Sequence, residues 1–149
     1  MTYRMNLIRS GDQTIRYDPE QTMKAYSAMR TGDPERCGCS YCLNFASQRG
    51  TVYPESFRRL LDQLGVDTQK EGEVYECGPD GPLRVYGGWF YFVSEFIERG
   101  EYRATDVATG FQYWFADGKA VPAPAAEFGA NVLAVEFLTK LPWVISEKP

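Results

Sequence analysis

The sequence contains no histidine. That absence excludes Ser-His-Asp and Cys-His catalytic groups, histidine general bases and every metal site that depends on an imidazole ligand. We therefore favour a non-enzymatic protein and leave the enzyme question open.

Long apolar runs are missing as well. No stretch approaches the roughly 20 apolar residues of a membrane-spanning helix. Residues 1–10 carry two arginines and lack the apolar block of a secretion signal. We therefore expect a cytoplasmic protein without a membrane partner.

The chain also lacks an excess of positive charge. Sixteen lysines and arginines stand against twenty aspartates and glutamates, which gives a net charge of −4. Nucleic acids and anionic membranes attract basic surfaces, so neither is expected as a partner. A protein or a small-molecule ligand is the expected partner. The small size and acidic charge also suggest an alternative function, an immunity-type inhibitor that binds another protein.

The 149 residues suit one domain, which we place at 1–149. Helical signals occupy the first half of the chain, and strand-like segments dominate from residue 73 onward. This order predicts an α+β domain in which N-terminal helices pack on a mainly antiparallel, aromatic-rich sheet.

Three helices carry clear signals. Asp18 is expected to cap the first, and Ser40 to cap a short helix that runs to residue 49. The clearest helix spans 54–64, where four apolar residues share one face. This stripe is formed by Phe57, Leu60, Leu61 and Leu64. We expect it to pack on sheet residues drawn from Trp89, Tyr91, Phe111, Tyr113, Leu133 and Val135.

The strand-like segments are separated by turn residues. We expect an N-terminal hairpin over 3–8 and 14–17, and a second hairpin at Asp117-Gly118, which is a typical two-residue turn. Gly87-Gly88 is expected to interrupt the chain as a bulge or a turn. The other expected elements are strands over 74–77, 83–86, 89–93, 111–116, 119–121 and 131–138, and a helical turn over 96–100.

The aromatic residues of the sheet imply that both of its faces are covered. One face should pack on the helices. The other is expected to be core too, or else to line a pocket or a dimer contact. Glu136 is the only charge within 132–138. Two interpretations of Glu136 stay open: it is a half-exposed strand residue, or it is a buried functional acid.

Three of the four cysteines lie within six residues, as Cys37-Gly38-Cys39-Ser40-Tyr41-Cys42. In a cytosolic protein such clustering favours metal or redox chemistry over disulfides. Four thiolates form a soft, tetrahedral donor set that suits zinc, and less well iron–sulfur. We therefore predict a metal site formed by Cys37, Cys39, Cys42 and Cys77.

The identity of the fourth ligand is the hardest part of that prediction to derive from the sequence, because the three other ligands are neighbours along the chain. Cys77 lies 35 positions beyond Cys42, so the fold must bring it back. Asp33 or Glu35 are the alternatives to it.

Two other interpretations stay open for the same cysteines. Reduced thiols without a ligand can serve as small buried apolar side chains. Cys42 falls in the first turn of the expected helix, where backbone N–H groups and the helix dipole favour a thiolate. A thiol redox enzyme or sensor that uses Cys39 and Cys42 is therefore an alternative function.

Several motifs together carry a resemblance. They are Cys37-x-Cys39-x-x-Cys42-x-Asn44-Phe45, Tyr53-Pro54-x-x-Phe57, Leu60-Leu61-x-x-Leu64-Gly65 and Tyr86-Gly87-Gly88-Trp89-Phe90. With them, residues 30–93 resemble a group of small uncharacterised bacterial proteins. The resemblance implies a bacterial cytosolic domain and no named activity. The pattern of that group has no cysteine at the position of Cys77, which favours a structural role for three cysteines.

Overall fold

The computed structural model describes residues 6–149, so positions 3–5 of the expected N-terminal hairpin lie outside the described residues. The helices are α1 (Pro19–Ser27), α2 (Asp33–Cys37), α3 (Ser40–Val52) and α4 (Glu55–Leu64), with a 3₁₀ turn η1 (Ala126–Phe128). The strands are β1 (Asn6–Ser10), β2 (Gln13–Tyr17), β3 (Glu73–Asp80), β4 (Leu83–Glu98), β5 (Ala104–Thr105), β6 (Gln112–Asp117) and β7 (Val132–Pro142).

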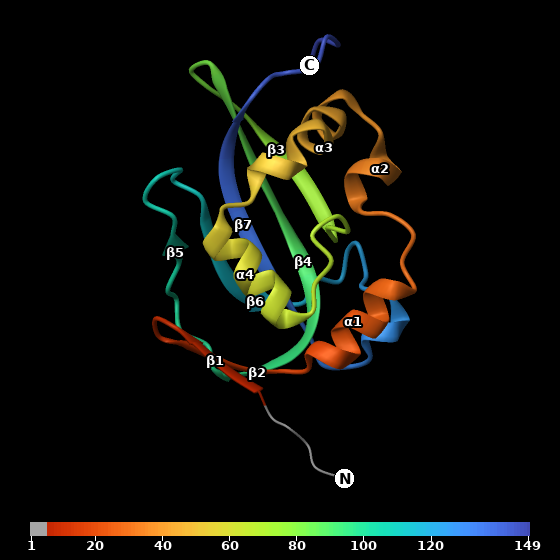
Figure 1. The fold of residues 1–149 in the computed structure, drawn as a ribbon, viewed down its shortest axis with the longest axis vertical. Helices are drawn as coiled ribbons and strands as arrows, with labels where there is room; N and C mark the ends of the chain where they lie inside the picture. The colour runs from red at the N-terminus through yellow and green to blue at the C-terminus, as the bar shows by residue number, and fades with distance from the viewer. Residues whose placement is uncertain (1–5) are drawn as a thin grey trace.

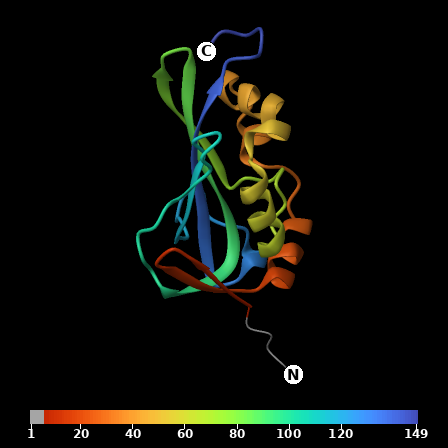
Figure 2. The same cartoon turned by 60° about the vertical axis from the view of Figure 1, so that its left-hand side comes forward.

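These strands form one antiparallel sheet of seven strands in the order β1-β2-β4-β7-β6-β5, with β3 also paired to β4. The central strand β4 pairs with β7 along one edge, and with β3 and then β2 along the other. The four helices lie on the same side of this sheet (Figures 1 and 2). The expected α+β arrangement, with N-terminal helices on an aromatic sheet, is therefore confirmed.

Helix α1 begins as the sequence predicts. The side chain of Asp18 accepts a hydrogen bond from the Gln21 N–H at 3.0 Å. The helix lies along the part of β4 where neither β3 nor β2 pairs. There the Val93 N–H donates to the Thr22 hydroxyl oxygen at 3.0 Å, and the Tyr26 hydroxyl donates to the Tyr91 carbonyl at 2.6 Å. Side chains of α1 thus satisfy backbone groups of β4 on the edge where neither β2 nor β3 pairs.

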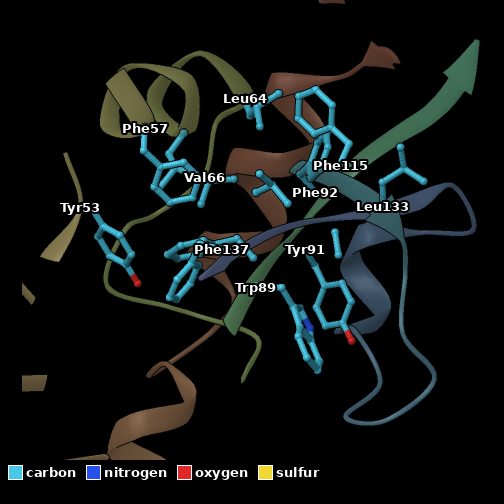
Figure 3. Packing of buried hydrophobic residues seen from close by; sticks show 14 of the residues in the cluster. Tyr53, Phe57, Leu64, Val66, Trp89, Tyr91, Phe92, Phe115, Leu133 and Phe137 are labelled. Carbon is cyan, nitrogen blue, oxygen red and sulfur yellow. The ribbon is translucent and has the colours of Figure 1, made fainter. Parts of the chain in front are cut away.

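Helix α4 packs its apolar stripe on the sheet, as expected. The Phe57 ring lies 4.9 Å from Phe111 and 5.0 Å from Tyr113, measured between ring centroids. The prediction was wrong for Trp89 and Tyr91, because side chains alternate along a strand and Phe90 takes the helix-facing position between them. Figure 3 shows Trp89 and Tyr91 set apart from Phe57.

The pair Gly87-Gly88 does not interrupt the chain, contrary to the sequence prediction. Residues 83–98 form one continuous strand, β4. A side chain at position 87 would meet the Tyr75 ring, and one at position 88 would meet the Phe137 ring. The two glycines therefore make room for one aromatic ring on each face of the sheet.

Two further local predictions were wrong. The segment 119–121 is not a strand, and β6 pairs with β7 instead of forming a hairpin at Asp117-Gly118. Pro122 and Pro124 follow closely and have no N–H to offer a neighbouring strand. Residues 96–98 are extended and not helical, because β2 pairs with them.

Among residues 6–149, no helix is both long and apolar enough to cross a membrane.

Candidate metal centre

The turn between α2 and α3 brings three thiols together. Cys37 is the last residue of α2, and Gly38 follows with φ of +66°. This left-handed conformation favours glycine, because a side chain there would be strained. The chain then enters α3 at Cys39. As a result, the Sγ atoms of Cys37, Cys39 and Cys42 lie within 4.8 Å of one another.

Cys39, and not Ser40, is the residue that caps α3. Its Sγ accepts a hydrogen bond from the Cys42 N–H at 3.5 Å. The bond joins the residue before the helix to the third helical residue, which is the usual geometry of an N-cap. The cap therefore holds two of the three thiols in a fixed relation.

The cap also changes which thiol loses its proton most easily. Partial burial acts to raise the pKa of Cys39, but hydrogen bonds from the Cys42 N–H, the neighbouring thiols and the Tyr41 N–H outweigh it and lower that pKa. Burial, and then the two neighbouring sulfurs, raise the pKa of Cys42 well above its ordinary value. The sequence prediction that Cys42 is the favoured thiolate was therefore wrong, because Cys42 is buried and Cys39 receives the N–H.

The three thiols differ in exposure. Cys37 and Cys39 are exposed, whereas Cys42 is buried. A bound ion would thus lie near the surface of the molecule, with the buried Cys42 as its ligand on the inner side. The donor set fits a soft metal ion, since thiolates select zinc over magnesium or calcium.

The structure does not place the expected fourth ligand with these thiols. Cys77 is exposed on β3 and is not part of the close group, by which we mean Cys37, Cys39 and Cys42. It precedes the tip of the β3–β4 hairpin, which lies away from α2 in Figures 1 and 2. The substitutes are engaged elsewhere. Asp33 accepts a hydrogen bond from the Val74 N–H at 2.8 Å, and Glu35 forms an ion pair with Arg49.

A buried ion pair supports the helix that carries Cys42. Glu71 is fully buried, and its two carboxylate oxygens accept hydrogen bonds from Arg49 at 2.9 and 3.0 Å. The Tyr53 hydroxyl donates to the same carboxylate at 2.6 Å. Arg49 therefore bridges Glu71 to Glu35 and joins α3 to α2 and to the segment before β3.

This network also shifts two pKa values. Burial and the nearby Glu71 carboxylate raise the pKa of Tyr53. Burial alone acts to lower the pKa of Arg49, but Glu71 and Glu35 outweigh it and raise that pKa. Both groups thus keep their protons. Sequence reasoning missed the network, because Glu71 lies in a polar segment without any helix or strand pattern.

Glu136 is half-buried and has two polar partners. The Trp114 indole N–H donates to its carboxylate at 3.2 Å, and the Lys119 ammonium lies 3.3 Å from the same oxygen. These contacts favour the interpretation of Glu136 as a paired strand residue over that of an isolated buried acid.

Comparisons of the chain with protein-family models, with curated proteins and with solved structures give no significant match. The chemistry of the site therefore rests on its own residues. They offer three closely spaced thiols, and the pKa of one of them, Cys39, is lowered.

Proposed function

We propose that Cys37, Cys39 and Cys42 bind one zinc ion, which stabilises the α2–α3 junction of a non-enzymatic binding protein. One observation carries this proposal, namely that the three Sγ atoms lie within 4.8 Å of one another. Zn–S bonds of about 2.3 Å place neighbouring sulfurs of a tetrahedral site roughly 3.8 Å apart. Small side-chain rotations thus bring the three thiols to three corners of such a site.

A structural role for the ion follows from the shortness of α2. This helix has only five residues, and helices of that length are unstable on their own. An ion held by Cys37 and Cys42 ties the end of α2 to the first turn of α3. The free energy of metal binding then contributes to folding. The fourth coordination position faces the exposed side of the site and is left to water or to an external ligand.

All four cysteines are free thiols. Thiols stay reduced in the cytosol and tend to oxidise outside it. We therefore also propose a cytoplasmic location.

The test is the metal content of reduced protein, measured by elemental analysis for three forms of the chain. We expect about one equivalent of zinc in the wild type and in Cys77→Ser, and little in Cys39→Ser. A chelator should lower the melting temperature of the wild type. Cys77→Ser is the matched control, because it removes a thiol outside the close group.

Two outcomes would overturn the proposal. The first is wild-type protein that holds no zinc, takes up none when reduced and melts at the same temperature with chelator. The second is loss of zinc in Cys77→Ser, which would restore Cys77 as the fourth ligand and remove the three-thiol site.

The Sγ atoms of Cys39 and Cys42 lie within 4.8 Å of each other. This closeness, together with the lowered pKa of Cys39, favours a second candidate function, a thiol redox sensor. The Cys39 thiolate would attack a disulfide such as oxidised glutathione, forming a mixed disulfide and releasing one thiolate. Cys42 would then lose its proton, displace the second glutathione thiolate and leave a Cys39–Cys42 disulfide. Mass spectrometry after treatment with oxidised glutathione tests this, since Cys42→Ser should stop at the mixed disulfide. If the mass of the wild type does not fall by the hydrogen atoms of two thiols, no Cys39–Cys42 disulfide has formed and the sensor is excluded.

A further inference from the structure

A pocket of about 400 Å³ lies between the end of α1 and the loop over 122–125. Aromatic side chains form part of its wall: Tyr26 from α1, Tyr91 from β4 and Phe128 from η1. The Tyr26 and Phe128 rings meet edge to face at 5.3 Å between centroids. In Figure 1 α1 lies next to the blue segment that carries η1. The pocket therefore has an apolar, aromatic side.

Hydrogen bonds hold this wall in place. The Tyr26 hydroxyl donates to the Tyr91 carbonyl at 2.6 Å, and the Tyr91 hydroxyl donates to the Pro122 carbonyl at 2.5 Å. The Lys70 ammonium donates to the Tyr26 carbonyl at 2.9 Å. Four segments that are distant in the chain are thus tied together around the pocket. A site whose walls are fixed before binding loses less entropy when a ligand enters.

The charge of the pocket is opposite to that of the whole protein. Arg30, Arg36 and Lys70 line it, and none of the aspartates and glutamates among residues 6–149 does, although the chain as a whole carries −4. Asp67 lies 3.5 Å from Lys70 and offsets part of that one charge. Arg36 donates a hydrogen bond to the neutral Thr31 carbonyl, so that contact leaves its charge available. The pocket is therefore a local positive site on an acidic protein.

We propose that this pocket binds a small organic anion with a flat apolar body. The body lies against Tyr26 and Phe128, and the anionic group pairs with Arg30 and Arg36. Guanidinium groups favour carboxylates and phosphates because their N–H groups match the geometry of those oxygens. The volume falls within the range of small-molecule sites. None of the three thiols lines the pocket, so this binding does not depend on the zinc proposal.

The experiment compares two probes of the same shape, the anion 2-naphthoate and the neutral 2-naphthamide. Isothermal titration calorimetry gives their affinities, and NMR shift changes give the location. We expect 2-naphthoate to bind about 10-fold more tightly, since two exposed cations, Arg30 and Arg36, pair with its carboxylate. The shifts should concentrate at residues 26–31, 70–72 and 122–128.

Variants separate the charge from the cavity. Arg30→Gln and Arg36→Gln should each weaken the binding of 2-naphthoate about 3-fold and leave 2-naphthamide unchanged. Arg59→Gln on α4 removes the same charge outside the pocket and should change neither affinity. Ala125→Leu fills the cavity and should weaken both probes. The melting temperature of each variant confirms that it is folded.

Three results would overturn the proposal. One is equal affinity for the two probes, which would mark an apolar patch with no preference for anions. Another is that Arg59→Gln weakens the binding of 2-naphthoate as much as Arg30→Gln or Arg36→Gln does. The preference for the anion would then come from the charge of the whole protein and not from the pocket. The last is the absence of binding, or shifts that lie outside the pocket.

Discussion

Gly88 lies directly opposite Phe137 in the β4–β7 pair, and the Phe137 ring occupies the space that a side chain at position 88 would need. Tyr75 does the same for Gly87 on the other face of the sheet. The glycines thus leave room for two aromatic rings, one on each face of β4. This arrangement brings Phe137 within 6.1 Å of both Phe45 and Phe57, between ring centroids, and so links the sheet to α3 and α4.

Gly88→Ala should therefore destabilise the protein. The added methyl group would lie 2.7 Å from the Phe137 ring and too close to the Glu73 carbonyl. Overpacking of a core costs about 1–3 kcal/mol, to be measured by urea unfolding. Gly50→Ala is the matched control, because Gly50 lies inside α3 with open space around it. It should stabilise by about 0.5–1 kcal/mol. A neutral Gly88→Ala would contradict the packing described for β4.

Local signals explain what could be predicted from the sequence. Asp18 and Pro19 mark the start of α1 within two residues, and the stripe of α4 needs only its own spacing. The three thiols of the metal centre also lie within one short turn, so their proximity was predictable. Each of these features depends on residues that are neighbours along the chain.

The predictions that were wrong concern features completed by distant residues. In the sequence, Gly87-Gly88 looks like a turn. In the fold, the ring of Phe137, almost fifty positions away along the chain, occupies the space beside Gly88. Glu71 looks like a loop residue in the sequence, but Arg49 of α3 and Tyr53, just after α3, donate hydrogen bonds to its carboxylate. No periodicity or cap records such contacts, because they arise only when the helices pack on the sheet.

Leu61→Ala should cost much more stability than a substitution on the outer face of the same helix. Leu61 is fully buried, and deleting a buried leucine side chain costs about 2–5 kcal/mol. Arg59 pairs with Glu55, and both side chains are largely exposed. Arg59→Ala should therefore change stability by less than about 0.5 kcal/mol. Equal effects in urea unfolding would be incompatible with α4 packing on the sheet.

Glu71→Ala should be among the most damaging single substitutions. It removes the carboxylate that accepts from Arg49 and Tyr53, and it leaves both donors in a buried environment. Breaking a buried ion pair by removing one partner costs about 3–5 kcal/mol. Glu55→Ala is the control, since it breaks an exposed pair. If Glu71→Ala unfolds at the same urea concentration as Glu55→Ala, the network does not hold α3 in place.

The carboxylate of Asp12 should make stability fall in acid. Hydrogen bonds from the Glu101 and Tyr102 N–H groups, in that order, lower its pKa below the ordinary value of 3.8. A lowered pKa in the folded state stabilises the protein above the unfolded value, and this is lost as pH falls through the folded value. The melting temperature of Asp12→Asn should therefore lie below that of the wild type at pH 7. The gap should begin to shrink as pH falls to about 3.8, and it should close once the pH is below the lowered pKa of the folded state. A gap that is independent of pH would contradict this role of Asp12.

Alkylation of reduced, metal-free protein should distinguish Cys39 from Cys42. Thiolates react with iodoacetamide and neutral thiols do not. The pKa of Cys39 is lowered by the hydrogen bonds that it accepts, and the pKa of Cys42 is raised by burial. As pH rises, Cys39 should therefore be modified first, and Cys42 should react only when the protein unfolds. Peptide mass spectrometry across a pH series gives both rates.

Zinc should then protect the same thiols. With one equivalent of zinc added, modification of Cys39 should slow sharply, because a bound thiolate no longer attacks the reagent. Cys77, which lies outside the close group, should react at the same rate with or without the ion. Unfolding in urea before alkylation is the control, since it should remove the difference between Cys39 and Cys42. If Cys42 reacts in the folded protein as fast as Cys39, the cap does not set the order of the thiols. If zinc slows all four cysteines alike, the ion does not bind at the α2–α3 turn.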